Sequence, residues 1–186
     1  AECCGAFCGG YPRFSDTGGL EFRHISQVAA KLIAKGSLPL KKGENPLRVA
    51  YHDPCMLGRL SEKYVPWNGK IRPFGLHVPE KQWRRGEHGV YEEPRAVLRA
   101  LEGVTLCEMT RNFEQALCCG ANARDVDAEF AAWTAAERRR EAKASGAEAV
   151  VSCCPFCQDA LGGEGENPLP YLDLAVLLAD RLREEA

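Results

Sequence analysis

The stretch AEAVVSCCPFC, residues 147–157, joins a short apolar run to three cysteines. Residues 147–152 have the length and the β-branched content of a buried strand. Pro155 suits the first turn of a helix, because its missing N–H would be unpaired there in any case. Cys154 and Cys157 stand three positions apart, so their sulfur atoms face the same way on that helix. The stretch therefore predicts a strand that leads directly into a helix bearing two thiols.

A similar stretch lies upstream in LRVAYHDPC, residues 47–55. Residues 47–51 predict a short strand, Asp53 is a good helix N-cap, and Pro54 suits the first helical position. The pattern predicts that Cys55 lies in the first turn of a helix, just past a strand end. The dipole at a helix N-terminus favours thiolate, which is the form that ligates metals.

The rest of the chain alternates between strand and helix patterns. Apolar spacing predicts helices over about 24–35, 93–101, 125–144 and 172–182, and a strand over 104–109. From residue 47 onward the order is strand, helix, strand, helix, strand, helix. This order predicts an α/β fold with a parallel sheet and flanking helices in Rossmann-like layers. Ligands of such sheets gather beyond the carboxyl ends of the strands, so we expect the cysteines at that edge.

Two features of the helix over 125–144 bear on its orientation. Val126, Phe130 and Trp133 share one face. The three consecutive arginines at 138–140 are expected on the solvated side, as a surface feature rather than a binding patch. Gly146 is expected to end the helix.

Composition narrows the classes of function. The 186 residues carry a net charge of −2, which argues against general nucleic-acid binding because that needs a basic face. No apolar run has the length of a membrane-spanning helix, and no secretory signal pattern is visible. The ten cysteines are too sparse for a disulfide scaffold, and six of them stand in adjacent pairs. We therefore expect a cytoplasmic protein in which clustered cysteines serve metal or redox chemistry.

The segment around residues 60–87 differs from the rest of the chain. Residues 59–88 carry seven basic and three acidic side chains, include Trp67 and Trp83, and show no clear periodicity. A long basic, aromatic loop inside a neutral domain is often functional. Two interpretations stay open, a docking surface for a partner and a packed surface loop.

A third cysteine group is Cys118-Cys119-Gly120. Adjacent cysteines cannot easily grip one tetrahedral ion together, but they can ligate different irons of a cluster. Gly120 lets backbone approach closely, and N–H groups near cluster sulfurs tune the reduction potential. The ordered set Cys55, Cys118-Cys119-Gly120 and Cys154-x-x-Cys157 is far more specific than any of its parts.

This ordered set resembles the CCG cysteine-rich domain of heterodisulfide reductase catalytic subunits, in their C-terminal portion, and of related HdrD-like iron–sulfur-binding oxidoreductase subunits. The resemblance covers residues 24–182 and rests on four segments: YHDPCMLGR at 51–59, GVYEEPR at 89–95, LCCG at 117–120 and CPFC at 154–157. The family has a shorter gap after its first cysteine, so residues 60–87 look like an insertion into a domain that spans 24–186. The glycine run that often follows the family's CCG is replaced here by Ala121-Asn122-Ala123-Arg124, which puts disulfide reductase activity in question.

The resemblance implies a noncubane [4Fe-4S] cluster that cleaves a disulfide in two one-electron steps. The implied ligands are Cys55, Cys118, Cys119, Cys154 and Cys157, with Cys153 as a neighbour or alternate ligand. It also implies an iron–sulfur subunit of a multi-subunit oxidoreductase. Its partners would be flavoprotein or ferredoxin-type subunits, its substrate a disulfide, thiol or quinone, and any membrane association would come through those subunits.

Other residues keep two interpretations each. Residues 1–23 resemble the closing end of an upstream cysteine-rich unit, so Cys3, Cys4 and Cys8 belong either to a second cluster or to a remnant without metal. His52 can protonate a leaving thiolate or bond a cluster sulfur, or else be structural. Arg59 and Arg95 bind an anionic substrate or pair with carboxylates. Cys107 is expected to be a small buried hydrophobe.

Two further functions compete with the redox interpretation. A structural zinc module would use four thiolates in a tetrahedral site, which leaves the Cys118-Cys119 pair poorly explained. A dithiol oxidoreductase would use Cys154 and Cys157 directly, which leaves three other cysteines without a role. Within the redox interpretation, the chain either performs bond chemistry as an enzyme or only relays electrons.

Overall fold

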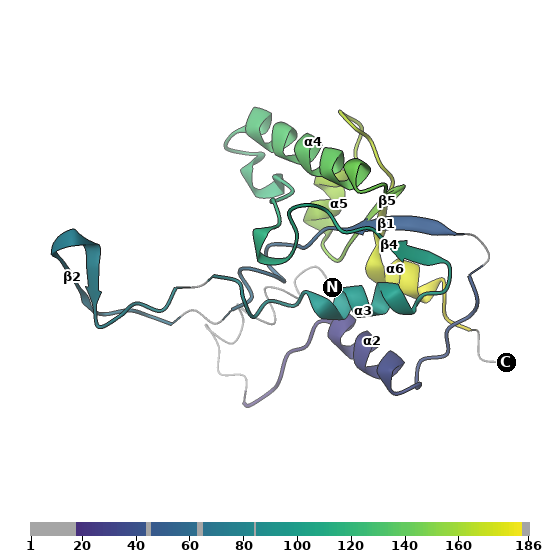
Figure 1. Ribbon diagram of the computed structural model, residues 1–186, viewed down its shortest axis with the longest axis horizontal. Coiled ribbons are helices and arrows are strands. Elements are labelled where there is room, and N and C mark those ends of the chain that lie inside the picture. The colour runs from purple at the N-terminus through teal and green to yellow at the C-terminus, as the bar shows by residue number, and fades with distance from the viewer. Residues whose placement is uncertain (1–17, 44–45, 63–64, 84, 184–186) are drawn as a thin grey trace.

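The centre of the molecule is a four-stranded parallel sheet, shown in Figure 1. The computed structural model describes residues 18–43, 46–62, 65–83 and 85–183. The strand order is β4-β1-β5-β6, and all three pairings are parallel. The strands are β4 (Val104–Leu106), β1 (Leu47–Tyr51), β5 (Ala149–Ser152) and β6 (Tyr171–Asp173). The predicted α/β class and parallel sheet are confirmed.

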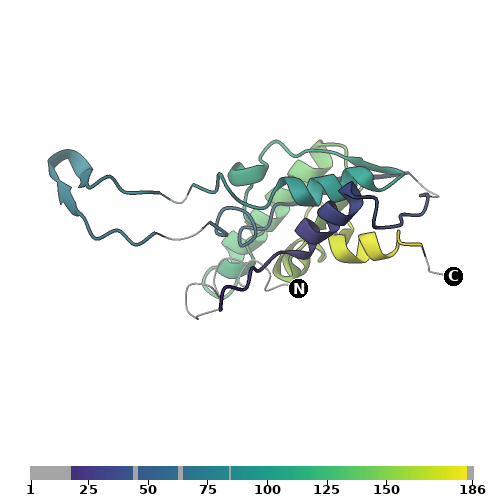
Figure 2. The same cartoon turned by 90° about the horizontal axis from the view of Figure 1, so that it is seen from below.

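Helices cover both faces of this sheet (Figures 1 and 2). One layer packs on the first face and consists of α2 (Ile25–Ala34), α3 (Glu92–Ala100) and α6 (Leu174–Ala179). The other layer consists of α4 (Ala128–Ala144) and α5 (Pro155–Leu161). Two short 3-10 helices, η3 (Phe113–Gln115) and η4 (Ala121–Ala123), lie in the segment before α4.

Strand alternation separates the two cores. Val49, Tyr51 and Val151 face the layer of α2, α3 and α6. Ala50 and Val150, one position along, face the layer of α4 and α5. Successive side chains of a strand point to opposite faces of the sheet. The position of a residue along the strand, and just after it, therefore decides which of the two cores its side chain joins.

Several predicted elements need correction. Cys55 follows β1 in a series of turns, not in a helix. The chain over 171–173 is the fourth strand, so the helix predicted over 172–182 is confined to α6. The strand predicted over 104–109 ends at Leu106. The predicted helices over 24–35, 93–101 and 125–144 are present within a few residues of their expected bounds.

The missing helix after β1 has a clear physical cause. The Asp53 carboxylate binds Arg95 of α3 through both oxygens, at 2.6 and 2.9 Å, and so does not cap a helix. The same guanidinium binds both carboxylate oxygens of Glu108, which follows β4, at 2.8 and 3.0 Å. The backbone N–H of Phe113 donates to Asp53 as well, at 3.0 Å. Arg95 is fully buried, so of its two interpretations the structure supports pairing with carboxylates, and this pairing is internal.

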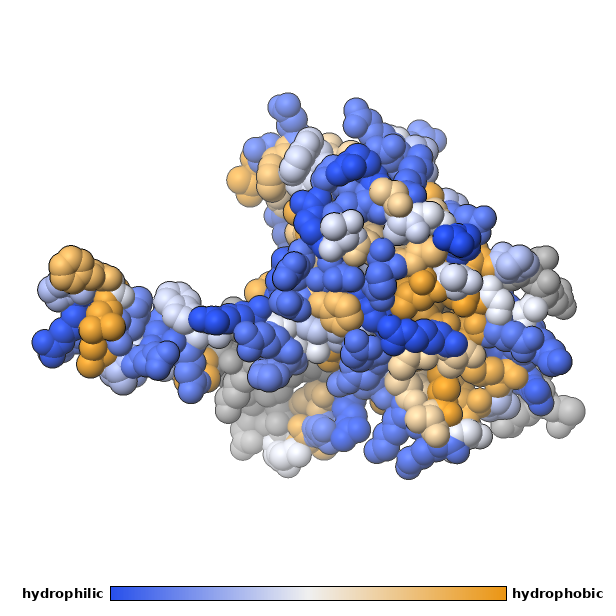
Figure 3. Space-filling view, in the orientation of Figure 1, coloured by the Kyte–Doolittle hydropathy of each residue, from blue (hydrophilic) through white to orange (hydrophobic). Residues whose placement is uncertain are grey.

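Residues 65–83 project from the body as an arm (Figures 1 and 2). Its outer part is a hairpin in which β2 (Lys70–Arg72) pairs antiparallel with β3 (Leu76–Val78) across η2 (Pro73–Gly75). The ring of His77, on β3, contacts the rings of Trp67 and Trp83 before and after the hairpin, with centroids 4.8 and 5.4 Å away. Ile71, Phe74 and Leu76 are exposed near the outer end, where Figure 3 shows apolar side chains among polar ones.

The buried Arg95 predicts a large effect on stability. We expect Arg95→Ala to lower the free energy of unfolding by about 3–5 kcal/mol, because two carboxylates lose the cation that neutralises them. Arg99→Ala is the matched control, since Arg99 lies on the same helix in an exposed pair with Glu92 and should change stability little. Urea titrations of the two variants measure the difference, and equal losses would contradict the prediction.

Candidate metal centre

Three segments bring cysteines together at the carboxyl edge of the sheet. His52 and Cys55 follow β1, and Cys154 and Cys157 follow β5 at the start of α5. The pair at 118–119 arrives on the segment between η3 and η4. The predicted meeting of these groups at the carboxyl edge follows from the parallel strand order.

The thiols of the five expected ligands form one continuous chain of neighbours. The Cys118 thiol lies beside the thiols of Cys55 and Cys119, and the three shift one another's pKa. The sulfurs of Cys119 and Cys157 lie within 4.8 Å of each other, and the Cys157 thiol in turn neighbours that of Cys154. Cys119, Cys154 and Cys157 are buried, whereas Cys55 and Cys118 are partly exposed. One side of the group is therefore open to solvent.

The other cysteines occupy different places. Cys153 packs against the opposite core, that of α2, α3 and α6, and its sulfur lies 3.5 Å from the Tyr51 hydroxyl oxygen. Cys107 is buried on the side of the five thiols, as expected for a small hydrophobe. Cys3, Cys4 and Cys8, expected as a second site or a remnant, lie outside the described residues.

The five thiols shift one another's pKa values, and the pKa of Cys118 is lowered. Hydrogen bonds from the thiols of Cys119 and Cys55 lower the pKa of Cys118 to about 2, and the backbone N–H of Gly120 contributes from 3.4 Å. The bond to Cys118 raises the pKa of Cys119 to about 11. Neighbouring thiols and burial also raise the pKa of Cys157. A cation bound among the sulfurs would lower the raised pKa values of Cys119 and Cys157.

His52 lies beside the thiols and is fully buried. One of its ring nitrogens lies within 4.8 Å of the sulfurs of Cys119 and Cys157. Its Nδ1 accepts a hydrogen bond from Nε of Arg138 at 2.9 Å, whereas its Nε2 is buried without a partner among the described residues. Burial and the charge of Arg138 lower the pKa of His52 well below its ordinary value, so the ring is neutral.

Arg138 corrects the expected orientation of α4. Arg138 and Arg139 are almost fully buried, whereas Phe130 and Trp133 are exposed. The inner face of the helix carries small residues, Ala131, Ala135 and Ala142, which let it approach the sheet closely and leave room for long arginine side chains. Apolar periodicity missed this face. The signal for the buried face is the spacing of Ala131, Ala135 and Ala142, which stand four and seven positions apart.

Arg59 contacts the segment that carries the cysteine pair at 118–119. Arg59 donates to the Ala116 carbonyl oxygen at 2.7 Å, in the segment that leads to Cys118.

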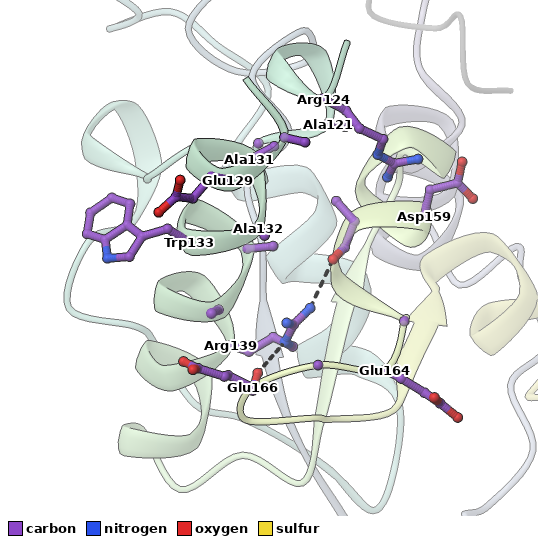
Figure 4. Close-up of a pocket in the computed structure, with 17 residues that line it drawn as sticks. Ala121, Arg124, Glu129, Ala131, Ala132, Trp133, Arg139, Asp159, Glu164 and Glu166 are labelled. Atoms are coloured by element: carbon purple, nitrogen blue, oxygen red, sulfur yellow. Dashed lines mark hydrogen bonds between the residues drawn. The ribbon is translucent and has the colours of Figure 1, made fainter. Parts of the chain in front are cut away.

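A cavity of about 470 Å³ lies between α4, η4, α5 and the loop 163–166, and Gly120 and Ala121 form part of its wall (Figure 4). In this cavity Arg139 donates to the carbonyl oxygens of Ala160 and Glu166, each at 2.9 Å. The buried arginine therefore joins α4 to the segments that close the far side of the cavity.

Parts of this chain are similar to a known protein family and to known proteins. The family model of the cysteine-rich domain, CCG, matches residues 76–162. The chain is 30% identical over 91% of its length to a probable iron-sulfur-binding oxidoreductase, FadF, of Bacillus subtilis. It is 34% identical over 74% of its length to one of the subunits of the dihydromethanophenazine:CoB–CoM heterodisulfide reductase of Methanosarcina mazei. It is 27% identical over 90% of its length to the EtfAB:quinone oxidoreductase of Syntrophomonas wolfei.

Residues 76–162 thus match the CCG cysteine-rich family, and the chain is similar to iron–sulfur oxidoreductase subunits, which confirms the resemblance drawn from its motifs. The matches cover 21%, 27% and 21% of these three relatives, so the chain spans about a fifth to a quarter of their length. In the described part of the chain, every helix is too short or too polar to cross a bilayer.

The close contact at Gly120 generates a prediction. Gly120 has a φ of +86°, and a Cβ added to it would lie 2.6 Å from the carbonyl oxygen of Ala131 on α4. We expect Gly120→Ala to destabilise the chain by about 1–3 kcal/mol, because the backbone is strained and the adjoining thiols must move away from α4. Gly163→Ala is the control, since its added Cβ would meet only an ordinary contact at 3.8 Å. Thermal unfolding of both variants measures the effect, and an equal stability of the two would refute this interpretation.

Proposed function

We propose that this chain binds an iron–sulfur cluster, of the noncubane [4Fe-4S] type, and serves as the electron-transferring subunit of an oxidoreductase. The proposed ligands are Cys55, Cys118, Cys119, Cys154 and Cys157. The single observation that carries the proposal is the unbroken chain of five neighbouring thiols at the carboxyl edge of the sheet.

The chemistry of the donor set supports a cluster. Cysteine thiolates are the usual ligands of iron–sulfur clusters, and four of them hold an ordinary [4Fe-4S] cluster. Five neighbouring thiols exceed that number, and they also exceed the four ligands of a structural zinc ion. The buried Nε2 of His52 lacks a partner among the described residues and lies in this group, as a hydrogen-bond donor to a cluster sulfur would.

The residues around the thiols would hold and shield the cluster. When bound, it would supply single electrons, two of which, with two protons, convert one disulfide into two thiols. The backbone N–H of Gly120 points to the sulfur of Cys118, and His52 closes the buried side, where both would stabilise added negative charge. The partial exposure of Cys55 and Cys118 leaves one side open for a substrate or for an electron partner.

The names of the relatives indicate which substrates to test. The relative from Methanosarcina mazei belongs to a CoB–CoM heterodisulfide reductase, and the relative from Syntrophomonas wolfei is named a quinone oxidoreductase. We propose that the protein containing this chain passes electrons to or from a disulfide or a quinone. An electron relay without bond chemistry is the alternative role of the same cluster.

We also propose redox partner subunits, of the flavoprotein or ferredoxin type, that contact the arm. Residues 65–79 carry Lys70 and Arg72 and no acidic residue, and the exposed Ile71 and Phe74 lie beside them. A partner surface with an apolar patch bordered by carboxylates would complement this end of the arm. On this proposal residues 60–87 are an insertion into the cysteine-rich domain, and the insertion serves for docking.

Metal analysis of cysteine variants tests the ligand set. We expect Cys119→Ala to remove most of the iron and acid-labile sulfide from protein purified without oxygen, because a buried central ligand is lost. Cys107→Ala and Cys153→Ala are the matched controls, and both should keep the cluster and its electron paramagnetic resonance signal. Loss of iron in Cys153→Ala would instead make Cys153 a ligand.

The wild-type protein decides between the competing functions in the same experiment. Several irons with sulfide support the cluster. One zinc ion without sulfide would overturn the proposal in favour of a structural module. An absence of metal together with reactive thiols at Cys154 and Cys157 would favour the dithiol oxidoreductase.

Charge reversal on the arm tests docking. We expect Lys70→Glu with Arg72→Glu to slow reduction of the cluster by a reduced acidic ferredoxin about tenfold at low ionic strength. The difference should vanish at about 0.5 M salt, where exposed charges are screened. Lys41→Glu with Lys42→Glu, two exposed lysines outside the arm, should leave the rate nearly unchanged. Equal slowing by both pairs would show a general charge effect and would contradict docking on the arm.

A further inference from the structure

We infer that Arg138 is a positioning residue, which fixes the tautomer and the orientation of His52 so that its Nε2–H donates a hydrogen bond to a sulfur of the bound cluster and raises the cluster's reduction potential. The inference rests on the proposed function, because it concerns the same site. It assigns a role to a residue that the sequence pattern placed on the surface.

The first step is that Arg138 is itself held in place. It comes from the inner face of α4 and is 1% exposed. Its Nη1 donates to the carboxylate of Glu141 at 2.7 Å and to the carbonyl oxygen of Arg111 at 2.6 Å. Glu141 also binds Arg111 Nε at 2.6 Å, so the carboxylate is fixed from two sides. The guanidinium therefore has one orientation, and its Nε points to His52.

The second step concerns the proton of the imidazole. A guanidinium has only donors, so the contact of 2.9 Å between Arg138 Nε and His52 Nδ1 requires that Nδ1 carry no proton. The His52 carbonyl oxygen accepts from the Ser152 hydroxyl at 2.7 Å, which fixes the backbone of this residue. A neutral ring with a bare Nδ1 carries its proton on Nε2.

The third step is that this proton needs an acceptor. Within the described residues, two buried side-chain nitrogens have no hydrogen-bond partner, His52 Nε2 and Arg138 Nη2. Both are donors, and both belong to the same bonded pair. An unsatisfied buried donor is costly, so the His52 Nε2–H indicates an acceptor beside this ring. The sulfurs of Cys119 and Cys157 lie within 4.8 Å of a His52 ring nitrogen, which puts a cluster bound there within its reach.

The consequence is a directional effect on electron transfer. A hydrogen bond to a cluster sulfur stabilises the more negative, reduced state, so it raises the reduction potential. Without Arg138, either ring nitrogen of His52 can carry the proton, and the bond is no longer fixed. A purely structural Arg138 would affect stability and cluster content, but it would not act through His52.

The experiment is an anaerobic redox titration of the cluster-loaded protein, followed by its electron paramagnetic resonance signal. The variants are Arg138→Met, His52→Phe and the double variant, with Arg138→Lys as the conservative change that keeps a donor. Arg139→Met is the matched control, because Arg139 is a neighbouring buried arginine that binds carbonyl oxygens instead of His52. Iron content and far-ultraviolet circular dichroism show which variants are loaded and folded.

We expect Arg138→Met and His52→Phe to lower the potential, the double variant to lower it no further than His52→Phe alone, and Arg138→Lys to lie nearer the wild type. Additive shifts would mean that Arg138 acts by its charge alone and would overturn the inference, as would unchanged potentials or an equal shift in Arg139→Met. If Arg138→Met does not retain iron, Arg138→Lys combined with His52→Phe makes the same comparison. A wild-type protein without a cluster would instead refute the proposed function, before any variant is compared.

Discussion

The buried guanidinium of Arg95 is the constraint from which the arrangement of the site follows. It binds the carboxylate that follows β1 and the one that follows β4, and the first of these also receives the N–H of Phe113. Two strand ends and the segment that leads to Cys118 are thus tied to one point on α3. Because ion pairs of this kind are costly to break once they are buried, the chain after each strand has little freedom. His52 and Cys55 hold their places next to the second cysteine group as a result.

The alternation of the strands then sorts the cysteines between two environments. Cys154 continues the face of β5 that packs on α4 and α5, and it joins the thiol chain there. Cys153, one residue earlier, lies against the other core beside Tyr51. A shift of one residue in strand register would exchange the two. The parallel pairing of β5 with β1 and β6 on its two sides therefore protects the composition of the site.

The sequence allowed prediction of the features that depend on local pattern. The strands β1 and β5 end where their apolar runs end, and the cysteines that follow them meet because parallel strands share an edge. The features it did not reveal depend on distant partners. Asp53 has the local pattern of a helix cap, but a guanidinium 42 positions away binds it instead. Arg138 stands in a run of three arginines, and only the close approach of α4 to the sheet shows that it is buried against His52.

The base of the arm has a consequence for how such a domain varies. The two ends of the arm close on each other, since the His88 N–H donates to Glu62 at 2.7 Å and the Val90 N–H to the Leu57 carbonyl oxygen at 3.1 Å. Gly86 also lies so near Arg59 that a Cβ there would come within 2.9 Å of its Cα. Among the described residues, 65–83 lie beyond this base and form the arm. Segments of other length or charge can replace the arm at this base, so that the arm can vary while the sheet and the thiols keep their arrangement.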